Sequence, residues 1–211
     1  MSHIFIECEQ GTPEWLQARA GAITGSNFRD AVSTLKSGTM TAKAIEYAAR
    51  VAIERVSGQP ADEGFVSWQM RRGTELEPEA RMAYEAKTGQ LAEEAGVAKT
   101  EDGKFGYSTD GLVGDVGLIE IKCVVSPIGV IQMWESADMS EYQHQMQGGM
   151  WITGRQWCDF VMYCPQLKSV GKEIFYRRVK RDDDFISAME LQLLAFEKKV
   201  SEFETILRKE V

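Results

Sequence analysis

The sequence YSTDGLVGDVGLIEIKC, residues 107–123, contains a short alternating strand that follows a glycine-rich turn. Side chains alternate between the two faces of a strand, so Glu120 and Lys122 point to one side and the isoleucines beside them to the opposite, buried side. A hairpin through the glycine-rich segment would bring Asp110 back beside Glu120. We therefore expect two carboxylates and an ammonium group on one face of a sheet.

This combination of side chains suits the hydrolysis of a phosphodiester bond. Carboxylate oxygens hold Mg²⁺ while it keeps several waters, which leaves positions for the scissile phosphate and for an attacking water. Lys122 could orient or help deprotonate that water and offset charge that develops on the phosphate. The tripeptide Glu-Ile-Lys alone is typical of a solvated strand face, and only its combination with Asp110 favours a metal-dependent nuclease.

The surrounding sequence predicts alternating blocks of helix and strand. Thr24 or Ser26 is expected to cap the second helix, and Pro78 should kink or restart the fourth. The order predicts an α/β fold (mixed α+β) with a central mixed sheet flanked by helices. Helices are expected near residues 13–21, 26–32, 41–58, 67–87, 140–153 and 184–208, and strands near 91–99, 105–109, 117–125, 156–164 and 173–180.

Composition excludes several classes of protein. The formal net charge of −8 argues against a protein that coats nucleic acid through a broad basic surface. The four cysteines include no C-x-x-C pair, which argues against a zinc or redox motif. No apolar run is long enough to span a bilayer and no secretory signal or linker is visible, so we expect a single cytoplasmic domain, residues 1–211, without membrane contact.

Three further motifs accompany the hairpin in a fixed order. Those before it are W-x3-R-x-G-x-I-T-x-S at residues 15–26 and G-x-x-L-E at 73–77, and Y-x-x-Q-x-Q-x3-W-I-T-G follows it at 142–154. Together with D-G-x8-E-I-K-C at 110–123, they resemble the phage lambda exonuclease (YqaJ-type viral recombinase) family of the PD-(D/E)xK nucleases. The resemblance covers residues 10–180 and implies a restriction-endonuclease-like core.

The resemblance also implies roles for residues at the cutting centre. Asp110 and Glu120 match the metal-binding carboxylates. Ile121 matches the residue that lends its main-chain carbonyl to the metal, and Lys122 matches the catalytic lysine. Gln145 matches the glutamine of the later motif. The implied cofactor is Mg²⁺, for which Mn²⁺ should substitute.

Other matching residues lie outside the hairpin. Glu77 matches an upstream helical acid, although Glu75 is an alternative register for it. Arg19, Ser26 and Ser108 match residues that bind a terminal 5′-phosphate. An arginine fork with hydroxyl groups near a helix start forms a compact anion site, whereas without the resemblance Arg19 would be interpreted as a surface charge and Ser26 as a helix cap.

The activity implied by the resemblance is digestion of linear double-stranded DNA. One strand would be removed 5′ to 3′ from a 5′-phosphorylated end, leaving a 3′ single strand for a single-strand annealing protein in recombination. A homotrimeric ring is implied as well. Thr109 stands where most members of the family carry proline, and we expect this residue to set the backbone conformation before Asp110 and not to bind the metal. Met70 could wedge the duplex open near the entrance.

Three alternatives to this activity remain open. An endonuclease or structure-specific repair nuclease could be built on the same catalytic core. A non-catalytic DNA-end binding module is disfavoured because Asp110, Glu120 and Lys122 are all present. A structural protein that does not bind nucleic acid would make the charged hairpin a coincidence.

Overall fold

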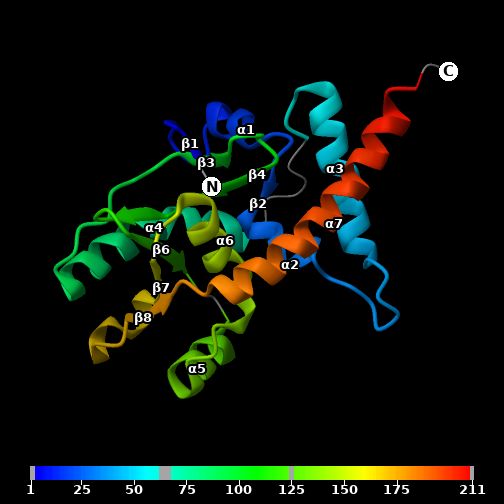
Figure 1. The fold of residues 1–211 in the computed structure, drawn as a ribbon. Coiled ribbons are helices and arrows are strands. Elements are labelled where there is room, and N and C mark those ends of the chain that lie inside the picture. Colours follow the sequence, from blue (N-terminus) through cyan, green and yellow to red (C-terminus); the bar gives the residue numbers. More distant parts are fainter. Residues whose placement is uncertain (1–2, 62–67, 124–125, 210–211) are drawn as a thin grey trace.

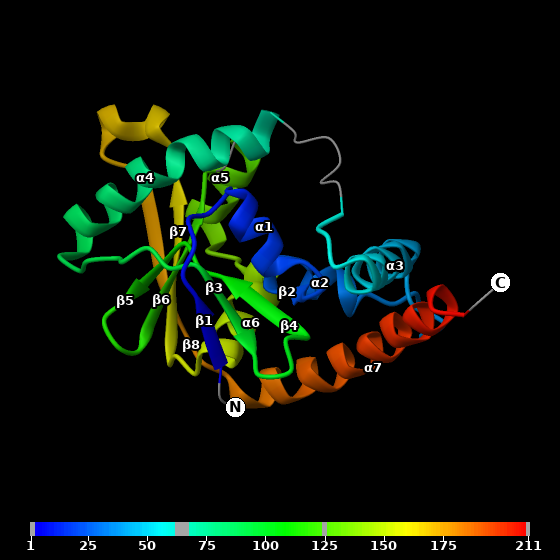
Figure 2. The ribbon, with the colours of Figure 1, turned by 90° about the horizontal axis from the view of Figure 1, so that it is seen from above.

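The structure, a computed structural model, describes residues 3–61, 68–123 and 126–209. In these segments the strands form two four-stranded sheets, and helices pack around and between them (Figures 1 and 2). Each sheet contains parallel and antiparallel pairs. The mixed α/β class with helices flanking mixed sheets, expected from the sequence, is therefore confirmed, although the strands divide into two sheets.

The first sheet has the order β1-β3-β4-β2. Its strands pair antiparallel except β2, which runs parallel to β4. The strand expected at 91–99 is shorter than predicted, because only an isolated bridge between Glu93 and Leu112 forms before residue 97. The strands are β1 (His3–Ile6), β2 (Ile23–Thr24), β3 (Val97–Thr100) and β4 (Phe105–Ser108), of which the first two were not expected.

The second sheet has the order β5-β6-β7-β8 and contains the predicted hairpin. Gly111 pairs with Ile119 and Val113 with Gly117, so Asp110 is returned to the level of Glu120. The strand expected to reach residue 125 ends at 122 in the described part, and residues 124–125 lie outside it. The strands are β5 (Gly111–Val113), β6 (Gly117–Lys122), β7 (Trp157–Tyr163) and β8 (Ile174–Lys180).

The longer helices begin and end largely where the sequence predicts. For α3, Thr41 caps the start through its side chain and Gly58 ends the helix in the left-handed conformation. Pro78 lies inside α4, which continues through it as one helix. The helices are α1 (Pro13–Arg19), α2 (Phe28–Ala31), α3 (Ala42–Ser57), α4 (Trp68–Thr88), α5 (Pro127–Ser136), α6 (Gln143–Thr153) and α7 (Asp183–Leu207), with 3₁₀ turns η1 (Gly25–Asn27), η2 (Ser140–Tyr142) and η3 (Pro165–Val170).

One local prediction about a helix was wrong, and one helix was not predicted. Neither Thr24 nor Ser26 caps α2, because η1 intervenes and the Thr24 hydroxyl accepts a hydrogen bond from the side-chain amide of Asn27 at 2.9 Å. Helix α5 was not predicted, although Ser126 caps it by accepting from the N–H of Gly129 at 3.3 Å.

Two hydrophobic clusters lie on opposite faces of the second sheet. One face of β6 presents Ile119 and Ile121 to α4, as the alternation predicts. The other face presents Leu118 to a larger cluster that extends to α3, α6 and α7, and Glu120 is fully buried on this side. Helices α3 and α7 lie side by side in both views (Figures 1 and 2). Within the described residues, no helix has the length and apolar character needed to cross a membrane.

Candidate active site

The candidate site lies where the chain passes from β4 of the first sheet to β5 of the second. Thr109 is buried at this crossing, and its hydroxyl donates to the carbonyl of Gly111 at 2.8 Å and accepts from the N–H of Gly111 at 3.2 Å. The side-chain amide of Gln10 donates to the Thr109 carbonyl at 2.8 Å. These bonds fix the backbone immediately before Asp110.

Asp110 is held against β6 by a main-chain hydrogen bond. The N–H of Ile121 donates to Oδ2 of Asp110 at 2.6 Å. Burial raises the pKa of the Asp110 carboxyl well above its ordinary value, and the nearby carboxylates of Glu120 and Glu77 raise it further. The negative charges of Glu120 and Glu77 therefore both act on Asp110, and a cation bound here would relieve that repulsion.

Glu120 is fully buried and has a donor on each carboxylate oxygen. The hydroxyl of Tyr107 donates to Oε2 at 2.9 Å, and the ammonium of Lys122 lies 2.6 Å from Oε1. Burying a charged carboxylate is strongly unfavourable unless it is paired and hydrogen-bonded, and Glu120 satisfies both conditions. The carboxylate consequently has a fixed orientation.

Lys122 connects the strand to α6. Its ammonium donates to Oε1 of Gln145 at 3.3 Å as well as to Glu120, and it lies 5.7 Å from the centre of the Tyr142 ring. Burial alone would lower the pKa of Lys122, but Glu120 and Asp110 outweigh it and raise the pKa above its ordinary value. The neighbouring carboxylates thus favour the charged form of the lysine.

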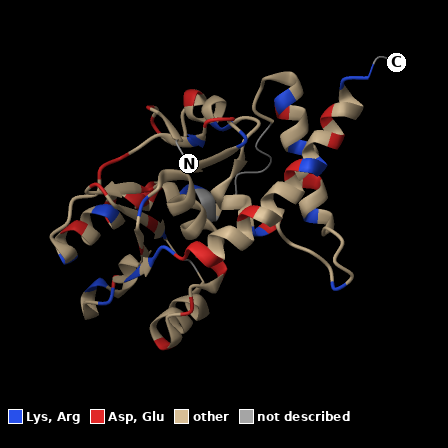
Figure 3. Ribbon diagram, viewed as in Figure 1, with Lys and Arg blue, Asp and Glu red and all other residues tan. Residues whose placement is uncertain are grey.

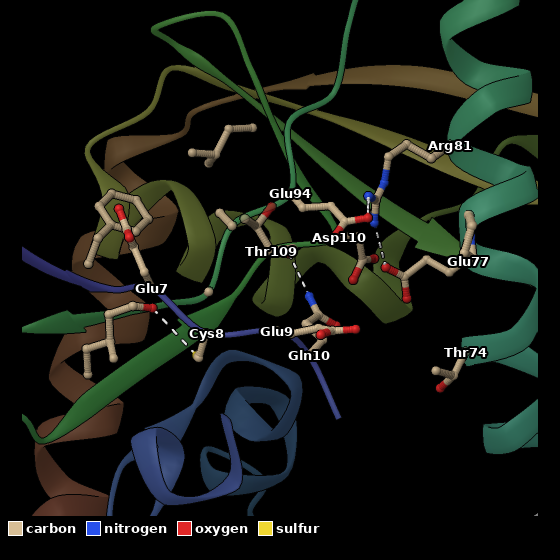
Figure 4. Close-up of a pocket in the computed structure, with 16 residues that line it drawn as sticks. Glu7, Cys8, Glu9, Gln10, Thr74, Glu77, Arg81, Glu94, Thr109 and Asp110 are labelled. Atoms are coloured by element: carbon tan, nitrogen blue, oxygen red, sulfur yellow. Dashed lines mark hydrogen bonds and ion pairs between the residues drawn. The ribbon is translucent and has the colours of Figure 1, made fainter. Parts of the chain in front are cut away.

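Glu77 reaches the site from α4 across a cavity of about 460 Å³, which Asp110 also lines (Figure 4). Arg81, one helical turn later, pairs with Glu77 at 3.1 Å and with Glu94. Burial raises the pKa of Glu77, and Arg81 partly opposes the shift. Figure 4 shows the side chains of Glu77, Arg81 and Glu94 turned toward one another and toward Asp110. Glu75, the alternative register, is exposed and does not line the cavity, so the geometry favours Glu77.

The oxygen donors suit a hard divalent cation such as Mg²⁺. Asp110 and Glu120 supply carboxylates, and Ile121 lies between Glu120 and Lys122 with its main chain at the site. Within the described residues, no three His, Cys, Asp or Glu side chains form a metal-binding group by themselves. A cation here would therefore rely on main-chain oxygen and water besides the two carboxylates, which fits the preference of Mg²⁺ for retaining waters.

Two of the three residues expected to bind a 5′-phosphate, Arg19 and Ser108, both contact Trp15. The Arg19 guanidinium stacks over the Trp15 ring at 3.9 Å, and the indole N–H of Trp15 donates to the Ser108 hydroxyl at 2.9 Å. Ser26 is exposed on η1, and its hydroxyl lies 3.4 Å from that of Thr24. Arg19 and Ser108 thus share Trp15 as a support, and Ser26 lies beside Thr24 on η1.

Two residues at the site were not found from the sequence. Tyr107 looks like an ordinary core aromatic of a strand, and Arg81 looks like an ordinary i,i+4 partner on a charged helix. Only the three-dimensional arrangement shows that each contacts an acidic group of the site. Met70 lies within α4, but its side chain is outside the described part, and the suggestion that it wedges the duplex stays a prediction.

The charge distribution is mixed rather than basic. Figure 3 shows acidic and basic residues interspersed along α3 and α7. Neither helix forms a continuous basic stripe in this view, in keeping with the net charge of −8.

The chain is similar to known proteins in both sequence and structure. A sequence model of the YqaJ-like viral recombinase domain matches residues 14–156. Among solved structures, an alkaline exonuclease (LHK-Exo) from Laribacter hongkongensis is 38% identical, with a TM-score of 0.81 over 93% of this chain and 97% of that chain. LHK-Exo in complex with dAMP gives a TM-score of 0.82 with the same identity and coverage.

A more distant solved structure shares the fold alone. It is a phage-related exonuclease from Haemophilus somnus 129PT, 19% identical, with a TM-score of 0.67 over 88% of this chain and 96% of that chain. No curated protein matches the chain at a significant level.

Proposed function

The chain belongs to the YqaJ-like viral recombinase family, and from this we propose that it is a Mg²⁺-dependent DNA exonuclease. Its substrate would be linear double-stranded DNA with a 5′-phosphorylated end. It would remove one strand 5′ to 3′ and leave a 3′ overhang. The observation that carries the proposal is the convergence of Asp110, Glu120 and Lys122 on one hairpin.

The relatives support the choice of reaction. LHK-Exo, 38% identical over nearly the whole chain, is described as an alkaline exonuclease and has been solved in complex with dAMP. A nucleoside monophosphate is the kind of product that stepwise hydrolysis of a DNA strand releases. The same chemistry is therefore proposed for this chain.

Each site residue has a task in the proposed reaction. Asp110, Glu120 and the main-chain carbonyl of Ile121 would hold Mg²⁺, and Mn²⁺ would substitute. When bound, the ion supplies Lewis-acid polarisation of the scissile phosphate and a more acidic water. Lys122 would orient the attacking water and offset negative charge at the phosphate.

The remaining polar residues would support these groups. Gln145 accepts a hydrogen bond from Lys122 and so limits where its ammonium can move. Glu77 faces the same cavity as Asp110 and would contribute further negative charge toward the cation. Arg81, which pairs with Glu77, would keep that carboxylate in its present orientation.

The preference for a 5′-phosphorylated end would come from Arg19, Ser26 and Ser108. A guanidinium presents a rigid fork of donors that suits phosphate. The Arg19 guanidinium stacks on the Trp15 ring, and the indole N–H of Trp15 donates a hydrogen bond to Ser108, two residues before Asp110. A terminal phosphate held by Arg19 and Ser108, with Ser26 as a third donor, would anchor the strand end near the cutting centre.

Cleavage of end-labelled DNA tests the proposed function. We expect a linear duplex with a 5′-phosphate to be digested in Mg²⁺ to mononucleotides from that strand alone, and digestion to stop in EDTA. A 5′-hydroxyl end should be digested more slowly. Cutting of closed circular duplex would instead indicate an endonuclease, and end binding without cutting would indicate a non-catalytic module.

Assembly and partner are proposed with the function. A homotrimeric ring would be threaded by the duplex and would deliver the overhang to a single-strand annealing protein. Ile128 and Ile131 of α5 are 62% and 61% exposed and would be available to such an interface. Light scattering that gives three times the 23.7 kDa chain mass would support the trimer, and a monomer mass would contradict it.

A further inference from the structure

We propose that Tyr107 is a positioning residue that fixes the carboxylate of Glu120 for metal binding. The proposal rests on the proposed function, because it takes Glu120 as a ligand of the divalent cation. Tyr107 belongs to β4 of the first sheet, whereas Glu120 belongs to β6 of the second. The bond between them therefore joins the two sheets at the reaction centre.

The hydrogen bonds of Glu120 define how its carboxylate is oriented. Tyr107 donates to Oε2 at 2.9 Å and Lys122 donates to Oε1 at 2.6 Å. Glu120 is fully buried, so it depends on these donors to offset the cost of removing its charge from water. Loss of the tyrosine hydroxyl would leave Oε2 without its donor and would free the carboxylate to rotate about its last torsion angle.

Two glycines hold the Tyr107 ring in place. A Cβ atom added at Gly149 of α6 would lie 2.5 Å from Cζ of the ring, and one added at Gly25 of η1 would lie 2.6 Å from Cδ2. Both distances are shorter than real Cβ contacts, so the backbone touches the ring at both positions. Tyr107 is 1% exposed, and the close contacts at its ring hold its hydroxyl toward Glu120.

Helix α6 thereby controls both donors to Glu120. Gln145 contacts the Lys122 ammonium, and Gly149, one helical turn later, contacts the Tyr107 ring. Residues behind the metal ligands commonly set ligand orientation, and their replacement typically costs 10–100-fold in metal affinity or activity. Tyr107 has the location and the contacts of such a residue.

Tyr84 provides a matched control within the same chain. Its hydroxyl donates to the buried carboxylate of Asp159 at 2.7 Å, so it makes the same kind of bond in the same kind of environment. Asp159 pairs in register with Ile119, on the sheet face opposite Glu120. Removing the Tyr84 hydroxyl should therefore disturb a buried tyrosine–carboxylate bond without touching the candidate site.

The experiment compares Tyr107→Phe with Tyr84→Phe and wild type, all as full chains. Mn²⁺ binding is measured without DNA, from the electron paramagnetic resonance signal of free Mn²⁺, and cleavage is measured across a Mg²⁺ titration. For Tyr107→Phe we expect the Mn²⁺ dissociation constant and the half-saturating Mg²⁺ concentration to rise about tenfold. KM for DNA should be unchanged, and Tyr84→Phe should match wild type in all three quantities.

A further variant retains the hydroxyl but moves it. Gly149→Ala would displace the Tyr107 ring, and we expect Mn²⁺ binding to weaken in the same direction as in Tyr107→Phe. Unaltered Mn²⁺ binding by Tyr107→Phe would overturn the proposal, as would an equal loss in Tyr84→Phe. Wild-type protein that binds no Mn²⁺ and cuts no DNA would instead overturn the proposed function, and this proposal with it.

Discussion

The ammonium of Lys122 lies 2.6 Å from Oε1 of Glu120 and 3.3 Å from Oε1 of Gln145. The Lys122 side chain remains 28% exposed, whereas that of Glu120 is 1% exposed. Solvent therefore reaches the ion pair at the Lys122 side chain and hardly at all at Glu120. An incoming phosphate would meet the cation before it met the carboxylate.

Replacing Lys122 by alanine should abolish cleavage while largely preserving binding to DNA ends. The ammonium orients the water and offsets developing charge, and effects of this kind are worth about 10²–10⁴-fold in rate. Single-turnover cleavage and end binding by fluorescence anisotropy are the measurements. Lys198→Ala, an exposed lysine of α7, is the control and should behave as wild type. Parallel loss of binding and cleavage in Lys122→Ala would contradict the assigned role.

Replacing Arg19 by alanine should erase the preference for 5′-phosphorylated ends. The guanidinium is the charged donor proposed for the terminal phosphate, so the 5′-hydroxyl substrate should be cut at nearly its wild-type rate. The measurement is the ratio of initial rates on the two substrates. Arg177→Ala, an exposed arginine on β8 of the other sheet, should leave the ratio unchanged. A variant at residue 19 that keeps the wild-type ratio would refute this placement.

Replacing Arg178 by alanine should destabilise the fold. Arg178 donates through two nitrogens to Asp159, each at 2.8 Å, and Asp159 is fully buried. The Arg178 side chain is itself 41% exposed, so water partly replaces it, and we expect its removal to cost about 1–2 kcal/mol in the free energy of unfolding. Denaturation in urea measures the loss, and Arg177→Ala, the exposed neighbour, should stay within about 0.5 kcal/mol of wild type. Equal stability of the two variants would show that Asp159 does not need the pair.

Tyr84 should make stability sensitive to alkaline pH. Burial and the Asp159 carboxylate raise the pKa of the Tyr84 hydroxyl above its ordinary value of about 10. The native state thus favours the protonated form, so its contribution is complete below pH 10 and is lost as the pH rises further. The stability advantage of wild type over Tyr84→Phe should shrink between pH 9 and pH 11. A constant difference over that range would contradict the shift.

Local patterns predicted the hairpin and the longer helices because the responsible interactions are close in sequence. The alternation of residues 118–122 and the glycines before them specify β5 and β6 without reference to the rest of the chain. Thr41 and Gly58 likewise mark both ends of α3. Asp110, Glu120 and Lys122 fall within this local unit, which is why their convergence could be expected.

Elements that depend on distant partners were missed. Strand β1 pairs with β3, more than ninety residues later, and β2 has only two residues and pairs with β4. Helix α5 is short and apolar and directly follows a strand, so its sequence shows no clear helical periodicity. Ser126 before Pro127 is nevertheless a recognisable helix start. The role of Tyr107 could not be predicted for the same reason, since its partner Glu120 lies on the other sheet, and the role of Arg81 could not be predicted because the cavity that its partner Glu77 faces forms only on folding.

The contact between Gly149 and the Tyr107 ring has a consequence for natural variation. Because no side-chain atom fits between them, the sizes of the two residues are coupled. Descendants of this chain that acquire alanine or serine at 149 should also carry a smaller residue at 107. Such pairs of changes would identify lineages in which another donor has taken over the carboxylate.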